Sequence, residues 1–414
     1  MGTPLITNDA VVLGFLICII AVVFITSNSE NLFWKKFYKF VPSLLLCYFI
    51  PSFLNSLGII SGENSNLYFV ASRYLLPTSL VLMTISINLH EIKKLGPKAI
   101  IMFITGTVGI IIGGPIAIFI ISFFEPNSMI GVNPEKVWRG LTTVAGSWIG
   151  GGANQAAMKE IFSVQDNLFS TMVAVDVMVS QIWLAFLLFG AGINKKIDIM
   201  LRADASVITE LRQKMEVYQS QILKIPNLTD IMKVMAIGFG VTALAHLGAD
   251  IIAPWISNNV PGLAKFSLTS KFFWLIILST TFALCLSFTK ARELEGVGAS
   301  RYGSLFLYIL VATIGMKMDI LSIFENPGLF VVGLIWITFH ALLLIIIAKL
   351  IRAPFFFLAV GSQANIGGAA SAPIVASAFH PSLAPVGVLL AVFGYAVGTY
   401  GAWVCGVMMQ IVTQ

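Results

Sequence analysis

Charged residues are scarce in this chain. Asp, Glu, Lys and Arg make up 11% of its 414 residues, whereas a soluble domain carries about 25%. Hydrophobic residues account for 57%, and the mean hydropathy is +0.92. Several apolar runs reach the roughly 20 residues that cross a bilayer. The composition therefore excludes an ordinary soluble domain and predicts an all-α polytopic membrane protein in contact with lipid.

Several motifs that would indicate other functions are missing. The sequence has no Walker A loop, so ATP is not expected as the energy source. It has no His-Glu-x-x-His pair and no Gly-x-Ser-x-Gly elbow, and no basic patch interleaved with aromatics that would bind nucleic acid. The four cysteines are dispersed in apolar segments and predict buried reduced thiols. We expect no enzymatic activity and no cofactor other than a coupling ion.

Twelve apolar segments fall into two halves of six. The longest polar stretch, 194–230, lies between the halves. It divides the chain into a predicted first repeat at 1–193, a cytoplasmic linker at 194–230 and a second repeat at 231–414. The segments are 9–26, 40–60, 67–88, 99–124, 140–161, 167–193, 231–256, 271–288, 301–318, 327–351, 354–378 and 383–412.

Two kinds of internal match support a duplication. The stretches 145–157 and 360–373 both read Gly-Ser followed by a Gly-Gly-Ala core, and the Gly-Gly-Ala cores are offset by 216 residues. Ala-Ser-Arg-Tyr opens the third segment at 71–74 and the ninth at 299–302, an offset of 228 residues. Matches at similar offsets in corresponding segments predict two homologous halves.

Loop charges predict the orientation. Lys and Arg are enriched after the first, third, sixth and eighth segments, and such loops remain in the cytoplasm. The linker is cytoplasmic only if the fifth segment dips into the membrane and returns. The second half then starts on the opposite side from the first, so the repeats are inverted. This predicts ten crossings, two re-entrant or broken elements, and both termini outside.

The glycine-rich pair forms the leading candidate site. Glycines interrupt a helix and free carbonyls that coordinate Na⁺, while the new helix N-termini face an anion. The alternative is close helix packing by small residues. The candidate substrate- and ion-binding residues are Ser147, Gly151, Gly152, Asn154, Gln155, Ser362, Gln363, Asn365, Gly367, Gly368 and Ser371.

Asp176 is the second candidate. It lies near the middle of the sixth segment, where an acid is costly and by default functional. With Asn154 and Asn365 it suggests a Na⁺ site, or it titrates a proton. A buried acid that is hydrogen-bonded to a neighbouring helix is the structural alternative.

Three further positions carry charge or a titratable ring. Arg73 and Arg301, from the repeated Ala-Ser-Arg-Tyr sequence, would contact an anion from opposite faces of the membrane, or would extend toward the headgroups. His340 lies inside the tenth segment and is expected to be a satisfied core histidine rather than a proton shuttle.

These motifs resemble the YjcL-like family of bacterial integral membrane proteins, catalogued as a domain of unknown function (number 819). The resemblance covers nearly the whole chain. It rests on Ala-Ser-Arg-Tyr at 299–302 and on Gly-Ser-Gln-Ala-Asn-Ile-Gly-Gly at 361–368. It implies a bacterial inner membrane. The layout is also similar to that of sodium/anion symporters of the bile-acid, glutamate and citrate types. That similarity implies inverted repeats, a scaffold and a mobile core.

Together these features predict an ion-coupled secondary transporter that carries a small organic anion with Na⁺ or H⁺ by an elevator-type mechanism. The alternative is a cation/proton antiporter in which Asp176 is the exchanging carboxylate. An intramembrane enzyme and a non-transporting scaffold are further alternatives. A homodimer is compatible with the sequence.

Overall fold

The computed structural model describes residues 4–413 except 39–40, 64, 125–133, 205, 213–225 and 319–327. Within these described ranges every regular element is a helix, and none is a strand. Long apolar runs with few charges fold as helices because a helix satisfies its backbone hydrogen bonds internally. The predicted all-α polytopic class is confirmed.

The first half begins with α1 and ends with a long helix, α10. A π-helical turn, Ala71–Leu75, joins α4 to α5 in one continuous rod. The elements are α1 (Asp9–Ser27), α2 (Leu32–Tyr38), α3 (Ser43–Ser56), α4 (Leu67–Val70), α5 (Leu76–Ile85), α6 (Leu89–Lys94), α7 (Pro97–Phe124), α8 (Pro134–Gly150), α9 (Gly152–Ile161) and α10 (Asp166–Gly192).

The second half follows a short helix, α11 (Asn194–Leu201), and repeats the order of the long elements. Both halves contain a helix that is broken at a glycine just before the last helix. The elements are α13 (Leu228–Asn259), η2 (Pro261–Phe266), α14 (Lys271–Ser287), η3 (Lys290–Val297), α15 (Ala299–Gly315), α16 (Gly328–Leu350), α17 (Phe355–Ile366), α18 (Gly368–Phe379), η5 (Pro381–Leu383) and α19 (Ala384–Val412).

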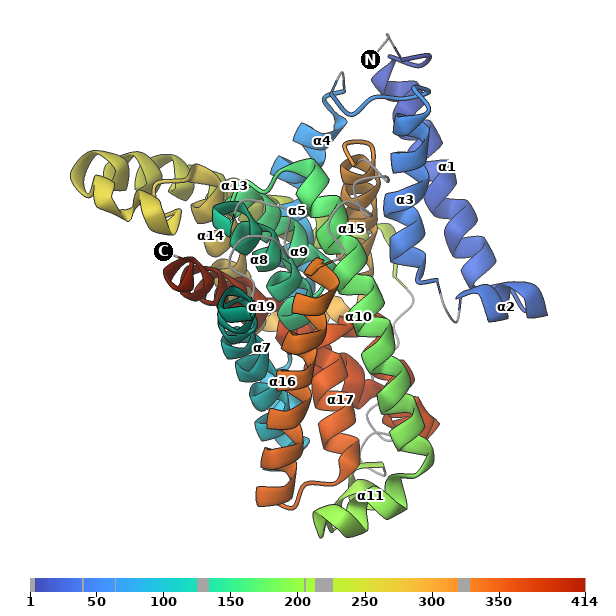
Figure 1. The fold of residues 1–414 in the computed structure, drawn as a ribbon. Coiled ribbons are helices and arrows are strands. Elements are labelled where there is room, and N and C mark those ends of the chain that lie inside the picture. Colours follow the sequence, from blue (N-terminus) through green and yellow to red (C-terminus); the bar gives the residue numbers. More distant parts are fainter. Residues whose placement is uncertain are drawn as a thin grey trace.

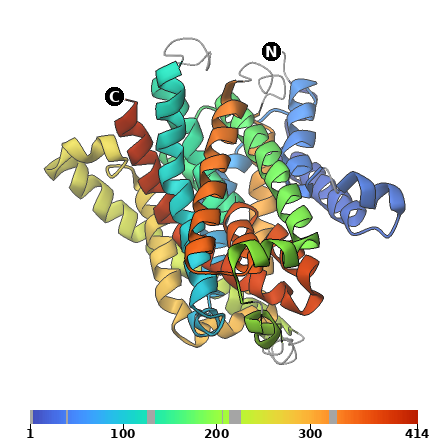
Figure 2. The ribbon, with the colours of Figure 1, turned by 60° about the horizontal axis from the view of Figure 1, so that its bottom comes forward.

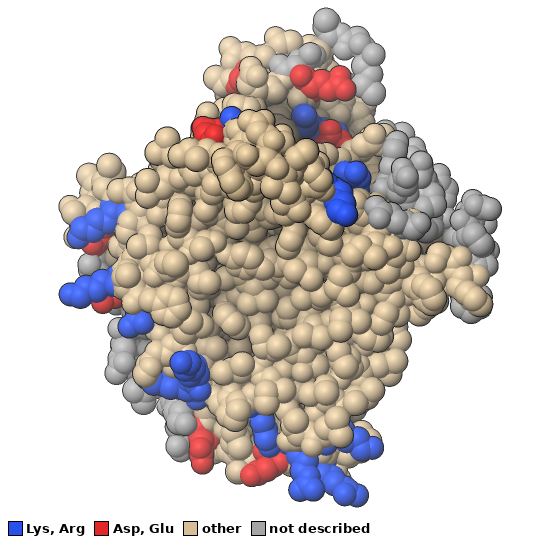
Figure 3. All heavy atoms as spheres, turned by 90° about the vertical axis from the view of Figure 1, so that its left-hand side faces the viewer, with Lys and Arg blue, Asp and Glu red and all other residues tan. Residues whose placement is uncertain are grey.

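Many of these helices match the thickness of a bilayer. By length and composition, seven helices in the described part of the chain qualify as membrane spans, or up to nine if α2 with α3 and α14 with η3 each count as one bent span. The 17-residue helix α15 is apolar but shorter than a full span. On the face shown in Figure 3, charged side chains lie at the margins and leave a broad central area without them, as expected of a surface that lies in lipid.

The broken helix of the first half folds back on itself. The Arg139 Nη1 donates a hydrogen bond of 3.0 Å to the Phe162 carbonyl, which joins the two ends of the segment. A Cβ added at Gly146 would lie 2.6 Å from the Asn154 carbonyl oxygen. In a straight helix, eight residues separate two positions by about 12 Å. Helices α8 and α9 therefore form a hairpin, named hairpin 1, with its tip at 150–152.

The broken helix of the second half does the same. The Phe356 and Phe379 rings, near the two ends of this segment, are 5.2 Å apart between centroids. The Gln363 Nε2 donates to the Ser371 Oγ at 2.6 Å, eight residues further along. Helices α17 and α18 form hairpin 2, with its tip at 366–368.

The hairpins enter the bundle from opposite ends. Hairpin 1 ends at Ile161, and α10 begins a few residues later. The far end of α10 leads into α11, whose Asp198 accepts a 2.7 Å hydrogen bond from the Phe355 N–H at the start of hairpin 2. Partial burial raises the pKa of Asp198, and the Phe355 N–H acts in the other direction. The 27-residue helix α10 is about 40 Å long, which sets the distance between the two hairpin bases.

The helices pack as two groups. We call α7–α10 and α16–α19 the hairpin bundle, and α1, α3–α5 and α13–α15 the frame bundle, because each group makes most of its contacts within itself. In Figures 1 and 2 the α13–α14 pair and the α1–α3 pair project from opposite sides of the molecule. The frame bundle has a small apolar core of its own, which includes Val81, Val234 and Ala283.

The close approach of the two arms of hairpin 1 can be tested by adding a methyl group at Gly146. We expect Gly146→Ala to lower the unfolding temperature, because the added Cβ meets the backbone of Asn154 and overpacking of this kind costs about 1–3 kcal/mol. Gly240→Ala, in α13, is the matched control, since nothing lies within 4 Å of its Cβ position. Equal melting of the two variants in a thermal unfolding assay would contradict the hairpin.

Candidate functional site

The two hairpin tips meet each other. A Cβ added at Gly368 would lie 4.0 Å from the Gly151 Cα. Gly151 has φ of +76° and Gly368 has φ of +54°, a region that a residue with a Cβ rarely adopts. The positive φ at both tips therefore favours glycine at each of these positions.

Backbone carbonyls of both hairpins face one point on α19. A Cβ added at Gly394 would lie 2.9 Å from the Ile149 carbonyl oxygen and 3.5 Å from the Ala364 carbonyl oxygen. These two carbonyls belong to the last turns of α8 and α17, where a helix leaves its acceptors without intrahelical donors. The absence of a side chain at Gly394 allows both oxygens to approach the same place.

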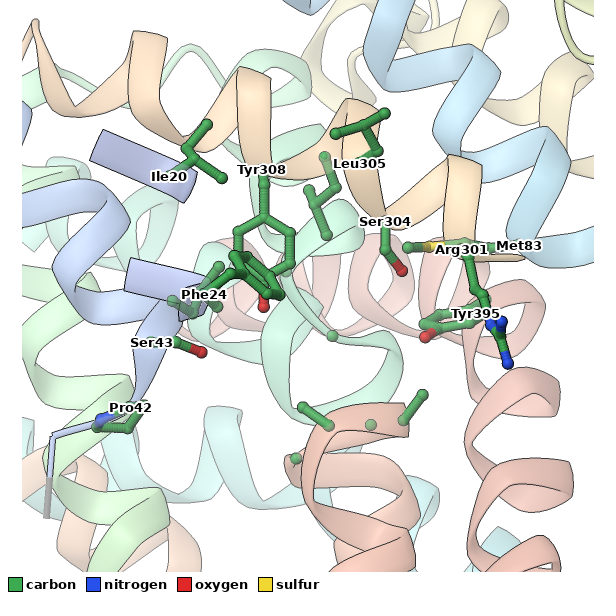
Figure 4. Close-up of a pocket in the computed structure, with 18 of the residues that line it drawn as sticks. Ile20, Phe24, Pro42, Ser43, Met83, Arg301, Ser304, Leu305, Tyr308 and Tyr395 are labelled. Atoms are coloured by element: carbon green, nitrogen blue, oxygen red, sulfur yellow. The ribbon is translucent and has the colours of Figure 1, made fainter. Parts of the chain in front are cut away.

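A cavity of about 660 Å³ lies between the hairpin tips and the frame bundle. Figure 4 shows side chains of α1, α3 and α15 above the tips, with Arg301 beside Tyr395. The lining residues are mostly apolar or glycine. They are Ile17, Ile20, Ala21, Phe24, Pro42, Ser43, Leu44, Met83, Gly151, Gly152, Arg301, Ser304, Leu305, Leu307, Tyr308, Gly367, Gly368, Ala369, Ala370 and Tyr395.

Asn154 fastens hairpin 1 to α19. Its Nδ2 donates to the carbonyls of Gly150 at 3.1 Å and Tyr395 at 3.0 Å. Its Oδ1 accepts a 2.6 Å hydrogen bond from the Thr399 hydroxyl. The side chain is completely buried, and it satisfies a carbonyl at the break in the helix.

Asn365 fastens hairpin 2 to α7 with the same pattern. Its Nδ2 donates to the carbonyls of Gly361 at 2.9 Å and Phe103 at 3.0 Å, and its Oδ1 accepts from the Thr107 hydroxyl at 2.7 Å. In both clamps the neighbouring helix offers a carbonyl and, four residues later, a threonine hydroxyl. Each asparagine therefore holds a tip in place from behind, away from the cavity.

Asp176 ties both arms of hairpin 1 to α10. Its carboxylate accepts hydrogen bonds from the Trp148 Nε1 at 2.7 Å and the Gln155 Nε2 at 2.9 Å, and the Ser147 side chain is a third partner. The residue is 5% exposed and does not line the cavity. Three neutral donors on two helices make this carboxylate a junction of the hairpin bundle.

Hairpin 2 is held by the same helix. Trp183, two turns after Asp176 on α10, donates from Nε1 to the Ser362 Oγ at 2.8 Å. His340 donates from Nδ1 to the Gly106 carbonyl at 3.0 Å, and its Nε2 lies 2.8 Å from the Ser362 Oγ. Both ring nitrogens of His340 are thus occupied, as the sequence analysis expected of a core histidine.

The two arginines of the repeated motif have different surroundings. Arg73 makes an ion pair of 2.9 Å with Glu160, which also accepts from the Tyr68 hydroxyl. Lys159, 5% exposed, pairs with Asp166 at 2.8 Å. This group lines a second pocket of about 410 Å³. We call these five residues the charged cluster.

Arg301 has no such partner. In the described ranges, no carboxylate lies within ion-pair distance of its guanidinium. The nearby Glu295 is engaged by the Ser300 backbone N–H at 2.9 Å and by the Ser300 and Ser86 hydroxyls. Arg301 lies in the first turn of α15. The second pocket, which is lined by the charged cluster, is also lined by Lys317, just beyond the other end of α15. The cavity and the charged cluster therefore lie toward opposite ends of this helix.

The structure therefore divides the sequence-predicted residues into two sets. Gly151, Gly152, Gly367, Gly368 and Arg301 line the cavity. The polar residues of the glycine-rich stretches stand behind the tips and bond to neighbouring helices; they are Ser147, Asn154, Gln155, Ser362, Gln363, Asn365 and Ser371, together with Asp176. Na⁺ ligation by Asn154, Asp176 and Asn365 stays a prediction.

Sequence reasoning did not select the hydroxyl groups of the cavity. Ser43, Ser304, Tyr308 and Tyr395 line it from three different helices. Single hydroxyl residues in apolar segments have no spacing that marks them. The threonines of the asparagine clamps, Thr107 and Thr399, are not among the predicted site residues either, although each stands four residues after the clamp carbonyl.

The fold and the site define a polytopic α-helical membrane protein built around two glycine-tipped hairpins. The chain belongs to the family described as "Protein of unknown function (DUF819)", which matches residues 14–412. It is also similar to the "Uncharacterized membrane protein YjcL" of Bacillus subtilis (strain 168), with 25% identity over 356 residues, or 83% of this chain and 84% of the relative.

Replacing Asp176 tests its role as a junction. We expect Asp176→Asn to lower the unfolding temperature, because an amide NH₂ would face one of the donors that the carboxylate now accepts from. Leaving a buried donor without an acceptor costs about 1–3 kcal/mol. Asp204→Asn is the control, since Asp204 is exposed. If the two variants unfold at the same temperature, Asp176 does not hold the hairpin.

Proposed function

We propose that this protein is an ion-coupled secondary transporter whose hairpin bundle moves against its frame bundle. One observation carries the proposal: two hairpins that enter from opposite ends bring their glycine tips together at a cavity between the bundles. Interrupted helices at membrane depth are tolerated where they are buried in protein or line a cavity. In secondary transporters, paired interruptions mark the binding site.

The arrangement of the halves supports inverted repeats, proposed here for 1–193 and 231–414 with 194–230 as a cytoplasmic linker. The long helices follow the same order in each half. The asparagine clamps are also reciprocal, because hairpin 1 is fastened to a helix of the second half and hairpin 2 to a helix of the first. Opposite entry of the hairpins is what inversion requires.

Alternating access follows from the two ends of the molecule. The basic residues Lys290 and Arg292 of η3, which precedes α15 in the chain, support a cytoplasmic location for the cavity end. At the opposite end, the charged cluster joins Lys159, Glu160 and Asp166 of the hairpin bundle to Tyr68 and Arg73 of the frame bundle. This structure then corresponds to a state that is open inward and closed outward, with both termini outside.

The coupling ion is proposed to bind where the two hairpins expose carbonyls to Gly394. Oxygen ligands suit Na⁺, and a monovalent cation needs no carboxylate in direct contact. Asp176 is held by neutral donors away from the cavity, which supports symport of Na⁺ with an organic anion over the cation/proton antiporter. Na⁺-driven H⁺ flux in proteoliposomes without any organic solute would overturn this choice.

Sodium binding gives a direct test. We expect Na⁺, compared with equal K⁺, to raise the unfolding temperature of the purified protein, because a ligand that binds only the folded state stabilises it. Gly394→Ala should abolish this increase, since its Cβ would lie 2.9 Å from the Ile149 carbonyl oxygen. Gly240→Ala should retain it. An unchanged Na⁺ response in Gly394→Ala would show that Na⁺ does not bind at this position.

Breaking the outer closure tests the movement. We expect Glu160→Gln to favour the state that is closed inward, because Arg73 loses its ion pair. A cysteine at Ala370, which lines the cavity and is exposed, should then react more slowly with a water-soluble thiol reagent. The background lacks Cys18 and Cys285, which are exposed and not buried as the sequence predicted.

The matched control is Glu91→Gln, which breaks a surface pair with Lys94, for which little effect is expected. Equal labelling rates in the two variants would show that the charged cluster does not hold the outer side closed.

A further inference from the structure

We propose that the cavity takes an amphiphilic monocarboxylate, a solute with one negative charge on an apolar body. The inference rests on the proposed transport function and names its substrate class. It begins from the charge balance of the cavity, where Arg301 is the single charged residue among the described residues that line the walls. Arg301 is exposed, so its guanidinium is open to an anionic ligand that enters the cavity.

A comparison of the two halves explains why Arg301 has no carboxylate partner in the described part of the chain. Its counterpart Arg73 is neutralised by Glu160 of hairpin 1. The position of hairpin 2 that corresponds to Glu160, at the same offset as the glycine cores, is Ala376. One arginine thus has an internal carboxylate and the other has none. The geometry points to a ligand carboxylate in the place that hairpin 2 does not fill.

The walls define the rest of the ligand. Ile17, Ile20 and Phe24 of α1 and Leu305 of α15 supply apolar surface. A volume of about 660 Å³ lies within the usual range for small-molecule sites. Figure 4 shows this apolar side, around Ile20 and Phe24, at some distance from Arg301. A molecule with a carboxylate at one end and a branched or aromatic group at the other fits this separation.

The same lining argues against two other classes. A dicarboxylate would place a second charge against apolar walls, and the described lining offers no second cation to receive it. A zwitterionic amino acid would need an acceptor for its ammonium group, and no acidic residue lines the cavity within the described ranges. The hydroxyls of Ser304 and Tyr395, which lie on the Arg301 side of the cavity in Figure 4, offer further polar contacts to a single carboxylate.

Four compounds with one common phenyl body test the class by equilibrium dialysis against the full-length purified protein. They are hydrocinnamate (monoanion), hydrocinnamamide (neutral), benzylsuccinate (dianion) and free phenylalanine (zwitterion). We expect hydrocinnamate to bind and each of the others to bind at least about tenfold more weakly, since each of them loses the charge-assisted hydrogen bond or adds an uncompensated charge. Preference for the dianion, the zwitterion or the amide overturns the proposal.

Variants locate the binding. Arg301→Gln should weaken hydrocinnamate binding by about tenfold or more, and Arg301→Lys, which keeps the charge, should lose less. Arg292→Gln is the matched control, because Arg292 is exposed on η3 and does not line the cavity. If Arg301→Gln does not fold, the Arg301→Lys and Arg292→Gln pair still decides. Equal affinity in the Arg301 and Arg292 variants overturns the assignment.

Two further measurements distinguish a lipid-derived ligand from a soluble one, and a failure of the ligand class from a failure of the transport function. Binding of dodecanoate without any binding of hydrocinnamate would assign the cavity to a lipid-derived anion and overturn the proposal for a soluble solute. Binding of hydrocinnamate without uptake into proteoliposomes would contradict transport and support the ligand class. Uptake of benzylsuccinate in preference to hydrocinnamate would support transport and overturn the ligand class.

Discussion

The structure depends on how two helices are interrupted inside an apolar bundle. A helix that ends there leaves carbonyls and N–H groups that neither lipid nor apolar side chains can satisfy. Asn154 bonds to the Gly150 carbonyl at the first break, and both Asn154 and Asn365 tie their hairpin to a neighbouring helix. The clamps stand behind the tips, while the tip glycines line the cavity.

The clamps also determine which parts move together. Asp176 and Trp183 lie on one helix and bond to hairpin 1 and hairpin 2, respectively. Each hairpin is thus attached to α10 and to one helix of the other half. Removing one partner of a buried hydrogen bond leaves the other group unsatisfied and costs its full desolvation energy. The hairpins and their supporting helices therefore form one unit. The frame bundle joins that unit through fewer polar contacts.

Arg73 and Arg301 have different surroundings, which makes the two ends of the molecule different. Both arise from the same four-residue sequence, yet one is paired within the protein and the other faces a cavity. Under the proposed function, this difference separates the two sides of the molecule. Glu160 supplies a carboxylate to Arg73, whereas Ala376 stands at the position offset by 216 residues, so the first side is proposed as a closure and the second as a binding surface.

The sequence by itself determined the all-α membrane class, because hydropathy and helix length are local properties. It located both hairpin tips, because a Gly-Gly-Ala core beside amide residues in each of two apolar segments favours a break in the helix. It also selected Arg301 and Asp176 as unusual. Only the tertiary structure decided that Asp176, Asn154 and Asn365 bond to protein groups while Arg301 faces the cavity. Thr399 lies 245 residues from Asn154 and Glu160 lies 87 from Arg73. Contacts over such separations depend on how helices pack and leave no periodic signal in the chain.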